Sequence, residues 1–167
     1  MRRHTIIDSP VGPLTAVAED DALIALYFEV HGRRPAVTEH GERADEDPLL
    51  TRARTQLGEY FGSERTTFEL PTDPPGDGFQ QRVWAQLREI PYGETRSYGQ
   101  LARALGQPGA AQAVGNANGA NPISIVVPCH RVIGSDGSLT GYAGGLERKR
   151  WLLAHEEPAA SVTGRLF

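Results

Sequence analysis

Cys129 is the only cysteine of the chain, and it stands between Pro128 and His130. A thiol reacts as its thiolate, which neighbouring cationic or hydrogen-bonding groups favour. His130, Arg131 and, further along, Glu156 are candidates for such a network. On extended backbone, however, adjacent side chains point to opposite faces, so adjacency alone does not bring His130 to the thiol. Two interpretations stay open at this point, a nucleophile and a buried inert thiol.

A nucleophile needs a pocket, and glycine-rich loops surround Tyr142 at residues 134–137 and 141–145. Glycines let a backbone approach a flat ligand closely and hold it through N–H and C=O groups. Tyr98 begins a short helical segment, where a tyrosine is either a half-buried core aromatic or a ligand contact. These residues indicate a candidate reactive cysteine beside a candidate binding loop.

Length and composition narrow the class of protein. The chain has 167 residues, 39% of them hydrophobic, which fits one globular domain or two small ones. No apolar run approaches the roughly 18 residues of a membrane span, and the residues after Met1 lack the apolar core of a signal peptide. A single cysteine excludes a disulfide framework and a multi-cysteine zinc site. We therefore expect a cytoplasmic protein with no membrane and no metal partner.

The net charge of −4 argues against a nucleic-acid-binding protein, but the acidity lies in one half. Residues 1–78 hold eight basic and fifteen acidic side chains, and residues 79–167 hold nine basic and six acidic ones. This asymmetry hints that the second half faces nucleic acid. Its few basic side chains predict modest affinity for DNA and a shallow dependence of that affinity on salt. They are Arg82, Arg88, Arg96, Arg103, Arg148, Lys149 and Arg150, and for Arg88 we expect simple solvation.

The first half predicts β structure followed by one helix. Three short apolar runs separated by turn residues are typical of an antiparallel meander, at residues 5–7, 14–17 and 23–28. The polar residues 31–47 predict a loop, and the apolar spacing of residues 49–61 predicts a helix. Three prolines and two glycines within residues 71–78 indicate a domain boundary. We expect domains at 1–75 and 76–157, followed by a tail at 158–167.

The second half predicts helices. Residues 79–90 carry one apolar stripe, and Ser97 is a candidate N-cap for a short helix that Gly106 ends. A second short helix at residues 110–118 makes the pair a candidate helix-turn-helix, although a generic helical hairpin has the same spacing. Asn121 and Pro122 break that helix. Residues 123–127 predict a strand leading to Cys129, and residues 146–155 predict a final helix.

The stretch Pro-Cys-His-Arg-Val-Ile-Gly at residues 128–134 resembles the active-site signature of the O6-alkylguanine-DNA alkyltransferases. Further motifs follow in that family's order and spacing, at residues 79–84, 90–95, 97–98, 113–115, 121–122, 141–146 and 151–156. The resemblance covers residues 79–156 with high specificity. Before residue 79 only the general order of strands and helix matches.

The resemblance implies an α/β fold class: a small N-terminal ribonuclease-H-like α/β domain and a mainly helical, winged-helix-like C-terminal domain with a helix-turn-helix. It implies a DNA repair protein that binds the minor groove of double-stranded DNA. Such a protein flips an O6-alkylguanine, chiefly O6-methylguanine but also O4-alkylthymine as a candidate, out of the stack. The alkyl group moves irreversibly to the cysteine, without a cofactor and once per molecule. A monomer is expected, and cooperative binding to DNA is left open.

The resemblance also implies a role for each matching residue. Cys129 would accept the alkyl group, His130 would deprotonate it through a water, and Glu156 would polarise His130. Tyr98 would donate a hydrogen bond to the departing guanine, and Asn121 would tie the helix-turn-helix to the active-site strand. The residues implied to contact the flipped base are Tyr98, Val132, Tyr142, Ala143 and Gly144. Those implied to contact DNA are Tyr98, Arg96, Ala110, Gln112, Ala113, Gly115, Asn116 and Arg131.

Gln112 departs from the family pattern, in which most members carry an arginine that fills the gap left by the flipped base. Glutamine is shorter and neutral, which predicts weaker binding or flipping of double-stranded DNA. Ala143 stands where a serine is common, and the thiolate zinc site of some relatives cannot exist here. Two alternative functions are an alkyltransferase-like protein that recognises damage without transfer, whose members lack the cysteine, and a cysteine hydrolase, for which the residues offer no separate support.

Overall fold

In the computed structural model, which describes residues 1–29, 37–140, 142 and 144–158, the N-terminal half forms a four-stranded sheet. Its strands, in the spatial order β3-β2-β1-β4, are β1 (Arg2–Ile7), β2 (Leu14–Glu19), β3 (Ala22–Phe28) and β4 (Glu42–Arg43). The first three form the predicted antiparallel meander, and β4 pairs parallel with β1. Prediction of residues 31–47 as a loop missed β4, because two exposed charged residues carry no apolar pattern.

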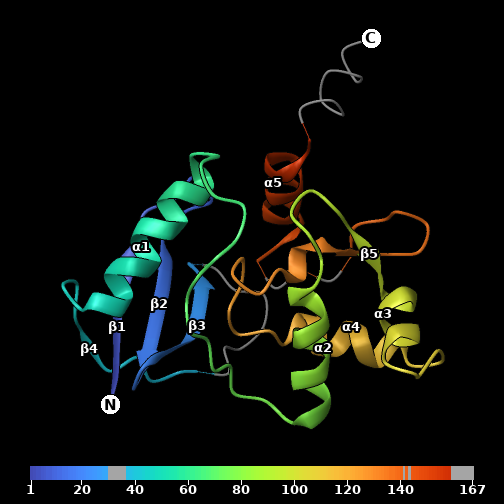
Figure 1. Cartoon of the computed structure of the whole chain (residues 1–167), viewed down its shortest axis with the longest axis horizontal. Helices are drawn as coiled ribbons and strands as arrows, with labels where there is room; N and C mark the ends of the chain where they lie inside the picture. The colour runs from blue at the N-terminus through green and yellow to red at the C-terminus, as the bar shows by residue number, and fades with distance from the viewer. Residues whose placement is uncertain (30–36, 141, 143, 159–167) are drawn as a thin grey trace.

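Helix α1 (Pro48–Phe61) packs on this sheet and contacts β1, β2 and β3 (Figure 1). Asp47 caps it, because its carboxylate accepts the Leu50 N–H at 3.1 Å, and the proline that follows has the φ angle of a first helical turn. Its apolar stripe includes Leu50 and Tyr60, both fully buried. The predicted helix at 49–61 is therefore confirmed.

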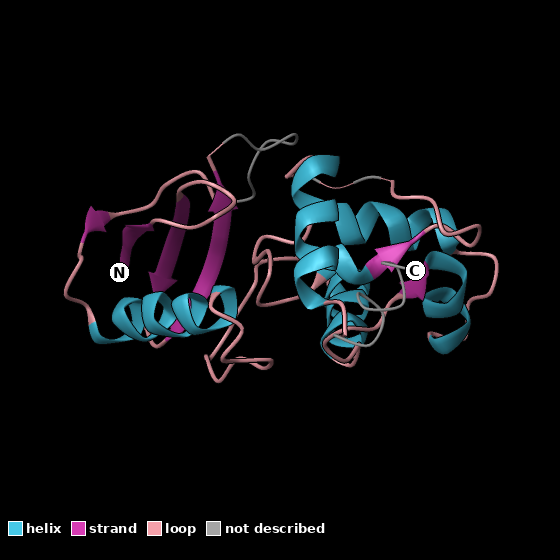
Figure 2. Ribbon diagram, turned by 90° about the horizontal axis from the view of Figure 1, so that it is seen from above, coloured by secondary structure: helices cyan, strands magenta, loops and turns pink. Residues whose placement is uncertain are grey.

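The C-terminal half is mainly helical (Figure 2). Its elements are α2 (Gly78–Arg88), β5 (Arg96–Ser97), α3 (Tyr98–Ala104), α4 (Ala111–Gly119), the 3₁₀ turn η1 (Cys129–Arg131), β6 (Val132–Ile133) and α5 (Leu146–Glu156). None of the helices in the described part of the chain is long and apolar enough to cross a membrane.

Helices α3 and α4 pack together as the helix-turn-helix. Ser97 begins α3 with a reciprocal cap: its hydroxyl accepts the Gln100 N–H, and the Gln100 side chain accepts the Ser97 N–H at 2.8 Å. Gly106 ends the helix region at φ +74°, a conformation that favours glycine. Strand β5 pairs parallel with β6, so the start of the helix-turn-helix is tied to the segment that follows Cys129.

Residues 123–127 are not the predicted strand. Only Ile123 forms a β-bridge, to Leu26, and the rest of the segment turns, with Ile125 at φ +71°. The Asn121 side chain accepts the Ile123 N–H at 3.1 Å and donates to the Val127 carbonyl at 2.8 Å. A side-chain amide thus satisfies backbone groups that a neighbouring strand would otherwise pair, and short apolar runs do not reveal this.

The two domains share one hydrophobic core and meet along β3. The Leu26 N–H donates to the Pro122 carbonyl at 2.8 Å, and the Ser124 N–H donates to the Leu26 carbonyl at 3.2 Å. The linker lies along the same strand, where the Leu23 N–H donates to the Pro71 carbonyl at 2.9 Å. The sheet therefore holds the segment that leads to Cys129.

Candidate active site

Cys129 begins the 3₁₀ turn η1 and is only 4% exposed. Two asparagines hold this segment, Asn118 in the last turn of α4 and Asn121 just after the helix. The Asn118 side chain donates to the Cys129 carbonyl at 3.2 Å, and the Asn121 side chain donates to the Val127 carbonyl at 2.8 Å. The Asn121 contact lies within the segment that leads to Cys129, whereas the contact from α4 to the cysteine itself comes from Asn118, so the link implied for Asn121 stays a prediction. Asn118 was missed, because nothing local in the sequence marks its contact with a carbonyl 11 residues later.

The protonation of the Cys129 thiol depends on opposing effects. Burial raises its pKa, while the Asn121 side chain and the charge of Lys149 act in the opposite direction. Lys149 is fully buried, and its ammonium donates to the Val132 carbonyl at 2.6 Å and to the Thr140 carbonyl at 2.9 Å. Burial lowers the pKa of Lys149 to about 8. The chain therefore places a buried cation near its thiol.

Lys149 is buried and Arg148 is half-buried, so neither is a freely solvated member of a basic surface. Three consecutive basic residues, 148–150, are typical of a solvated helix face. In the structure only Arg150 among them is exposed. Arg148 donates to the Val11 carbonyl at 2.9 Å and to the Gly144 carbonyl at 3.2 Å. The carbonyls that bind these cations lie far away in sequence or in loops, so no local signal marks them.

His130 is fully buried and its Nε2 lies 2.7 Å from Glu156 Oε2. Burial would raise the pKa of Glu156, but hydrogen bonds and charge from His130 and Arg131 outweigh it and lower the value to about 2. Burial lowers the pKa of His130, so its imidazole is neutral at neutral pH. We assign the ring proton to Nε2, because an ionised carboxylate can only accept. His130 Nδ1 has no hydrogen-bond partner among the described residues and carries the free lone pair.

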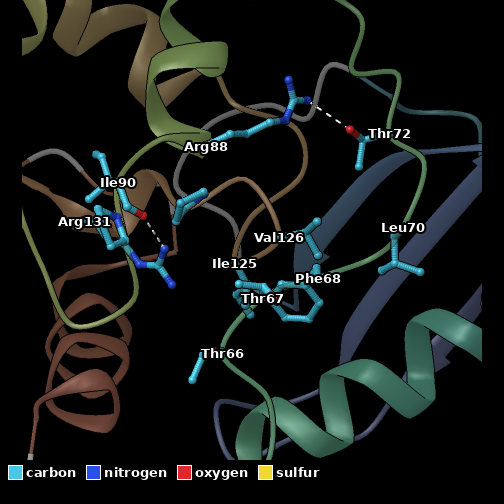
Figure 3. A pocket seen from close by; sticks show the side chains of 12 residues that line it. Thr66, Thr67, Phe68, Leu70, Thr72, Arg88, Ile90, Ile125, Val126 and Arg131 are labelled. Carbon is cyan, nitrogen blue, oxygen red and sulfur yellow. Dashed lines mark hydrogen bonds between the residues drawn. The ribbon is translucent and has the colours of Figure 1, made fainter.

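Arg131 does not lie on a DNA-facing surface, which corrects the role implied for it. Its side chain is buried, donates to Glu156 Oε1 at 2.7 Å and Oε2 at 3.0 Å, and donates to the Ile90 carbonyl at 2.8 Å. Arg131, Arg88 and Thr72 line a cavity of about 290 Å³. Figure 3 shows these side chains around it. The carboxylate that retains Arg131 comes from α5, 25 residues later.

Of the residues implied to contact the flipped base, Tyr142 and Gly144 pack against the N-terminal domain, and Val132 contacts Lys149. Tyr142 is buried, and its ring meets the ring of Phe28 edge to face at 5.8 Å. Gly144 lies against the same ring, since a Cβ at this position would be 2.6 Å from Phe28. The Val132 carbonyl accepts from Lys149, as described above. Ala143 lies outside the described residues.

A hollow of about 720 Å³ lies between the helix-turn-helix and the loop after β6. Its walls include four implied DNA contacts, Tyr98, Gln112, Gly115 and Asn116, together with Arg103, Asp136 and Thr140. The Tyr98 hydroxyl donates to the Thr140 carbonyl at 3.1 Å. The other implied DNA contacts do not line it. Ala110 and Ala113 belong to the start of α4, and Arg96 pairs with Glu94 at 3.2 Å.

Tyr60 was also missed as a functional residue, because its residue type suggested core packing. Tyr60 of α1 donates its hydroxyl proton to Glu156 Oε2 at 2.6 Å. Its position in the apolar stripe of a helix carries no sign of this contact. No group of three or more histidine, cysteine or acidic side chains that could hold a metal ion occurs within the described ranges.

Comparison with known proteins covers both halves of the chain. The family model "6-O-methylguanine DNA methyltransferase, ribonuclease-like domain" matches residues 2–74, and "6-O-methylguanine DNA methyltransferase, DNA binding domain" matches residues 78–158. A curated relative from Mycolicibacterium paratuberculosis, a methylated-DNA–protein-cysteine methyltransferase, is 48% identical over all of this chain and 99% of its own. A relative of the same name from Methanosarcina acetivorans is 43% identical, covering 92% of this chain and 97% of its own.

The fold has a similar counterpart among solved structures. The crystal structure of Mycobacterium tuberculosis OGT in complex with DNA has a TM-score of 0.85 and 50% sequence identity, over 92% of each chain. Both the ribonuclease-like and the helical DNA-binding domain are therefore accounted for. On these matches, the chain belongs to the 6-O-methylguanine DNA methyltransferase family.

Proposed function

We propose that this protein repairs O6-alkylguanine, chiefly O6-methylguanine, in double-stranded DNA by transferring the alkyl group to Cys129. The observation that carries the proposal is a buried imidazole whose Nδ1 is free and whose Nε2 is held by Glu156, in the residue that follows the buried Cys129. The family membership and the DNA complex of the M. tuberculosis relative support the same substrate.

The reaction is a displacement at the alkyl carbon. The bond between Cys129 Sγ and the alkyl carbon forms as the bond between that carbon and guanine O6 breaks. The thiol proton passes through a water to His130 Nδ1, and the departing guanine takes up one proton, so a thioether and guanine are the products. The described residues include no group that would cleave a thioether, and each molecule would therefore act once.

The remaining residues position the base and the DNA. Tyr98 would donate a hydrogen bond to the leaving guanine, and this requires its hydroxyl to exchange the Thr140 carbonyl for the base. Val132, Tyr142, Ala143 and Gly144 would surround the flipped base. Asn121 would hold the cysteine segment against α4, and no cofactor takes part.

The helix-turn-helix would bind the minor groove through the contacts implied for it, at Arg96, Ala110, Gln112, Ala113, Gly115 and Asn116. Arg131 is omitted from this set because Glu156 and the Ile90 carbonyl already hold it. We also propose that the protein works as a monomer with domains at 1–75 and 76–157. A reducing compartment, the cytoplasm, would keep the thiol of Cys129 reactive.

Intact-protein mass spectrometry after incubation with duplex DNA containing O6-methylguanine tests this function. We expect each chain to gain one methyl group in place of one hydrogen, with the modified peptide carrying Cys129. A Cys129→Ser protein should bind the DNA but gain nothing. Many product molecules per protein, or tight damage binding without any mass gain, would contradict the proposal, and the second result would favour damage recognition without transfer.

A further inference from the structure

Tyr60 links the N-terminal domain directly to the carboxylate behind His130. It belongs to α1, is fully buried, and its hydroxyl lies 2.6 Å from Glu156 Oε2. His130 Nε2 lies 2.7 Å from the same oxygen. We propose that Tyr60 is a positioning residue for the reaction: it fixes the proton-accepting form of His130 by donating to Glu156. This inference rests on the roles proposed above for Cys129, His130 and Glu156.

The direction of the hydrogen bond follows from the state of each partner. Burial raises the pKa of Tyr60, so its hydroxyl keeps its proton. Glu156 is ionised above a pKa of about 2 and offers only lone pairs. Arg131 always donates, and it occupies both carboxylate oxygens. Because the ionised carboxylate can only accept, His130 must also donate to it, from Nε2. Its Nδ1 then keeps the lone pair that takes the proton of Cys129.

Tyr60 also controls how basic His130 is. A hydrogen bond to a carboxylate draws negative charge away from the oxygen that would stabilise an imidazolium ion. Without the Tyr60 hydroxyl, Glu156 Oε2 would stabilise protonated His130 more strongly, and the pKa of His130 would rise. A protonated His130 cannot accept a proton from Cys129, so transfer would fail at a higher pH than in the native protein.

A substitution at Tyr60 leaves the other titratable or charged groups that interact with His130 or Glu156 chemically unchanged. They are Arg131, Lys149, Tyr92 and Tyr142. Tyr92 is the useful comparison, because its ring lies 6.2 Å from that of Tyr60 while its hydroxyl donates to the His155 carbonyl at 3.3 Å. It is thus a neighbouring tyrosine whose hydroxyl does not bind Glu156.

The test is the pH profile of single-turnover methyl transfer from O6-methylguanine DNA by Tyr60→Phe, which keeps the ring and removes only the hydroxyl. We expect the acid limb to move to higher pH, with a rate about three- to tenfold lower than native at the acid end and within about twofold at pH 8. Tyr92→Phe should leave the limb where it is. A rate lowered equally at every pH would mean that Tyr60 is only a packing residue and would overturn the inference.

Glu156→Gln separates this inference from the proposed function. If Glu156→Gln has the native rate and pH profile, the proposed proton transfer fails. If Glu156→Gln alters the profile while Tyr60→Phe matches the native protein, only the inference about Tyr60 fails. We expect the double variant Tyr60→Phe/Glu156→Gln to match Glu156→Gln, because the hydroxyl acts through the carboxylate.

A direct measurement covers the case in which Tyr60→Phe does not fold. In Cys129→Ser protein labelled with ¹⁵N-histidine, NMR should show His130 protonated at Nε2 and unprotonated at Nδ1. The Tyr60 hydroxyl proton should appear as a slowly exchanging downfield signal whose shift follows the titration of His130. A hydroxyl signal indifferent to that titration, or a His130 protonated at Nδ1 instead, would refute the role of Tyr60.

Discussion

At the scale of single residues, the site depends on how buried charges are balanced. Glu156 is matched by Arg131, whereas Lys149 donates to two carbonyl oxygens and to no carboxylate in the part of the chain that the structure describes. Burying a cation without a counter-ion costs free energy unless the cation is fully hydrogen bonded, so such a residue suggests a functional role. Near Cys129, that role is to favour the thiolate over the thiol.

Lys149→Met tests this role. Loss of the charge should raise the pKa of Cys129 and slow methyl transfer at pH 7 by about tenfold. The unmatched Val132 and Thr140 carbonyls should lower the free energy of unfolding by about 1–3 kcal/mol. Single-turnover kinetics and urea unfolding measure both, with exposed Arg150→Met as the control. Transfer at the native rate would contradict the role of Lys149.

The pH dependence of stability gives an independent check on Lys149. Its folded pKa of about 8 lies below the ordinary lysine value of about 10.4, so the unfolded chain binds more protons between these values. Stability conferred at this position should therefore rise as pH increases from 8 towards 10. Lys149→Met should lack that rise. Equal pH dependence in both proteins would mean that Lys149 titrates normally.

At the scale of elements, local patterns predicted what local interactions determine. The meander, α1 and the helix-turn-helix follow from apolar spacing, turn residues and caps such as Ser97. The prediction for 123–127 was wrong because β3 pairs only the start of the segment, while the Asn121 side chain binds the Ile123 N–H and the Val127 carbonyl. The buried cations Arg131 and Lys149 escaped prediction because their partners are distant in sequence or lie on loops.

Helix α4 carries the prediction that concerns DNA binding. Gln112→Arg places one cation in the wall of the hollow between α4 and the loop after β6, and it should tighten binding to duplex DNA and speed repair. The slope of log affinity against log salt should steepen by about 0.9, the value for one added phosphate contact. Fluorescence anisotropy at several salt concentrations and single-turnover repair measure these effects.

The control is Gln86→Arg, which adds the same charge on α2. It should leave both the salt slope and the repair rate near their native values. Reaction with the free base O6-benzylguanine should be equal in all three proteins, because no phosphate is involved. Unchanged or slower duplex repair by Gln112→Arg would show that the glutamine is not what limits binding.

At the scale of the whole molecule, the N-terminal domain supports the site of the C-terminal domain at separate points. Leu26 pairs with the 122–124 segment, Tyr60 reaches Glu156, and Phe28 packs on Tyr142 and Gly144. Arg148 completes the last contact, since its guanidinium lies over the Phe28 ring at 5.1 Å. The charge division of the sequence could predict which half faces DNA, but it could not predict these contacts.

Arg148→Met tests whether the contact between domains positions the base-binding loop. It removes the hydrogen bonds to the Val11 and Gly144 carbonyls while keeping an apolar stem over Phe28. We expect methyl transfer to slow by about tenfold and stability to fall by about 1 kcal/mol. Single-turnover kinetics measures the transfer rate and urea unfolding measures the stability, with Arg150→Met as the control. A loss of stability with native kinetics would show that the contact serves folding alone.

The packing of Phe28 on Gly144 limits how this sequence can diverge. A side chain at 144 has no room while the ring remains at 28, because its Cβ would be 2.6 Å from that ring. A smaller residue at 28 would remove that clash and leave one with the Tyr142 ring, 2.9 Å from the same Cβ, whereas a homologue that keeps the ring at 28 would keep both. The two positions lie in different domains, 116 residues apart. Substitutions at 28 and 144 should therefore occur together among homologues. When the N-terminal domains of distant homologues are exchanged, this contact should be the first to be lost.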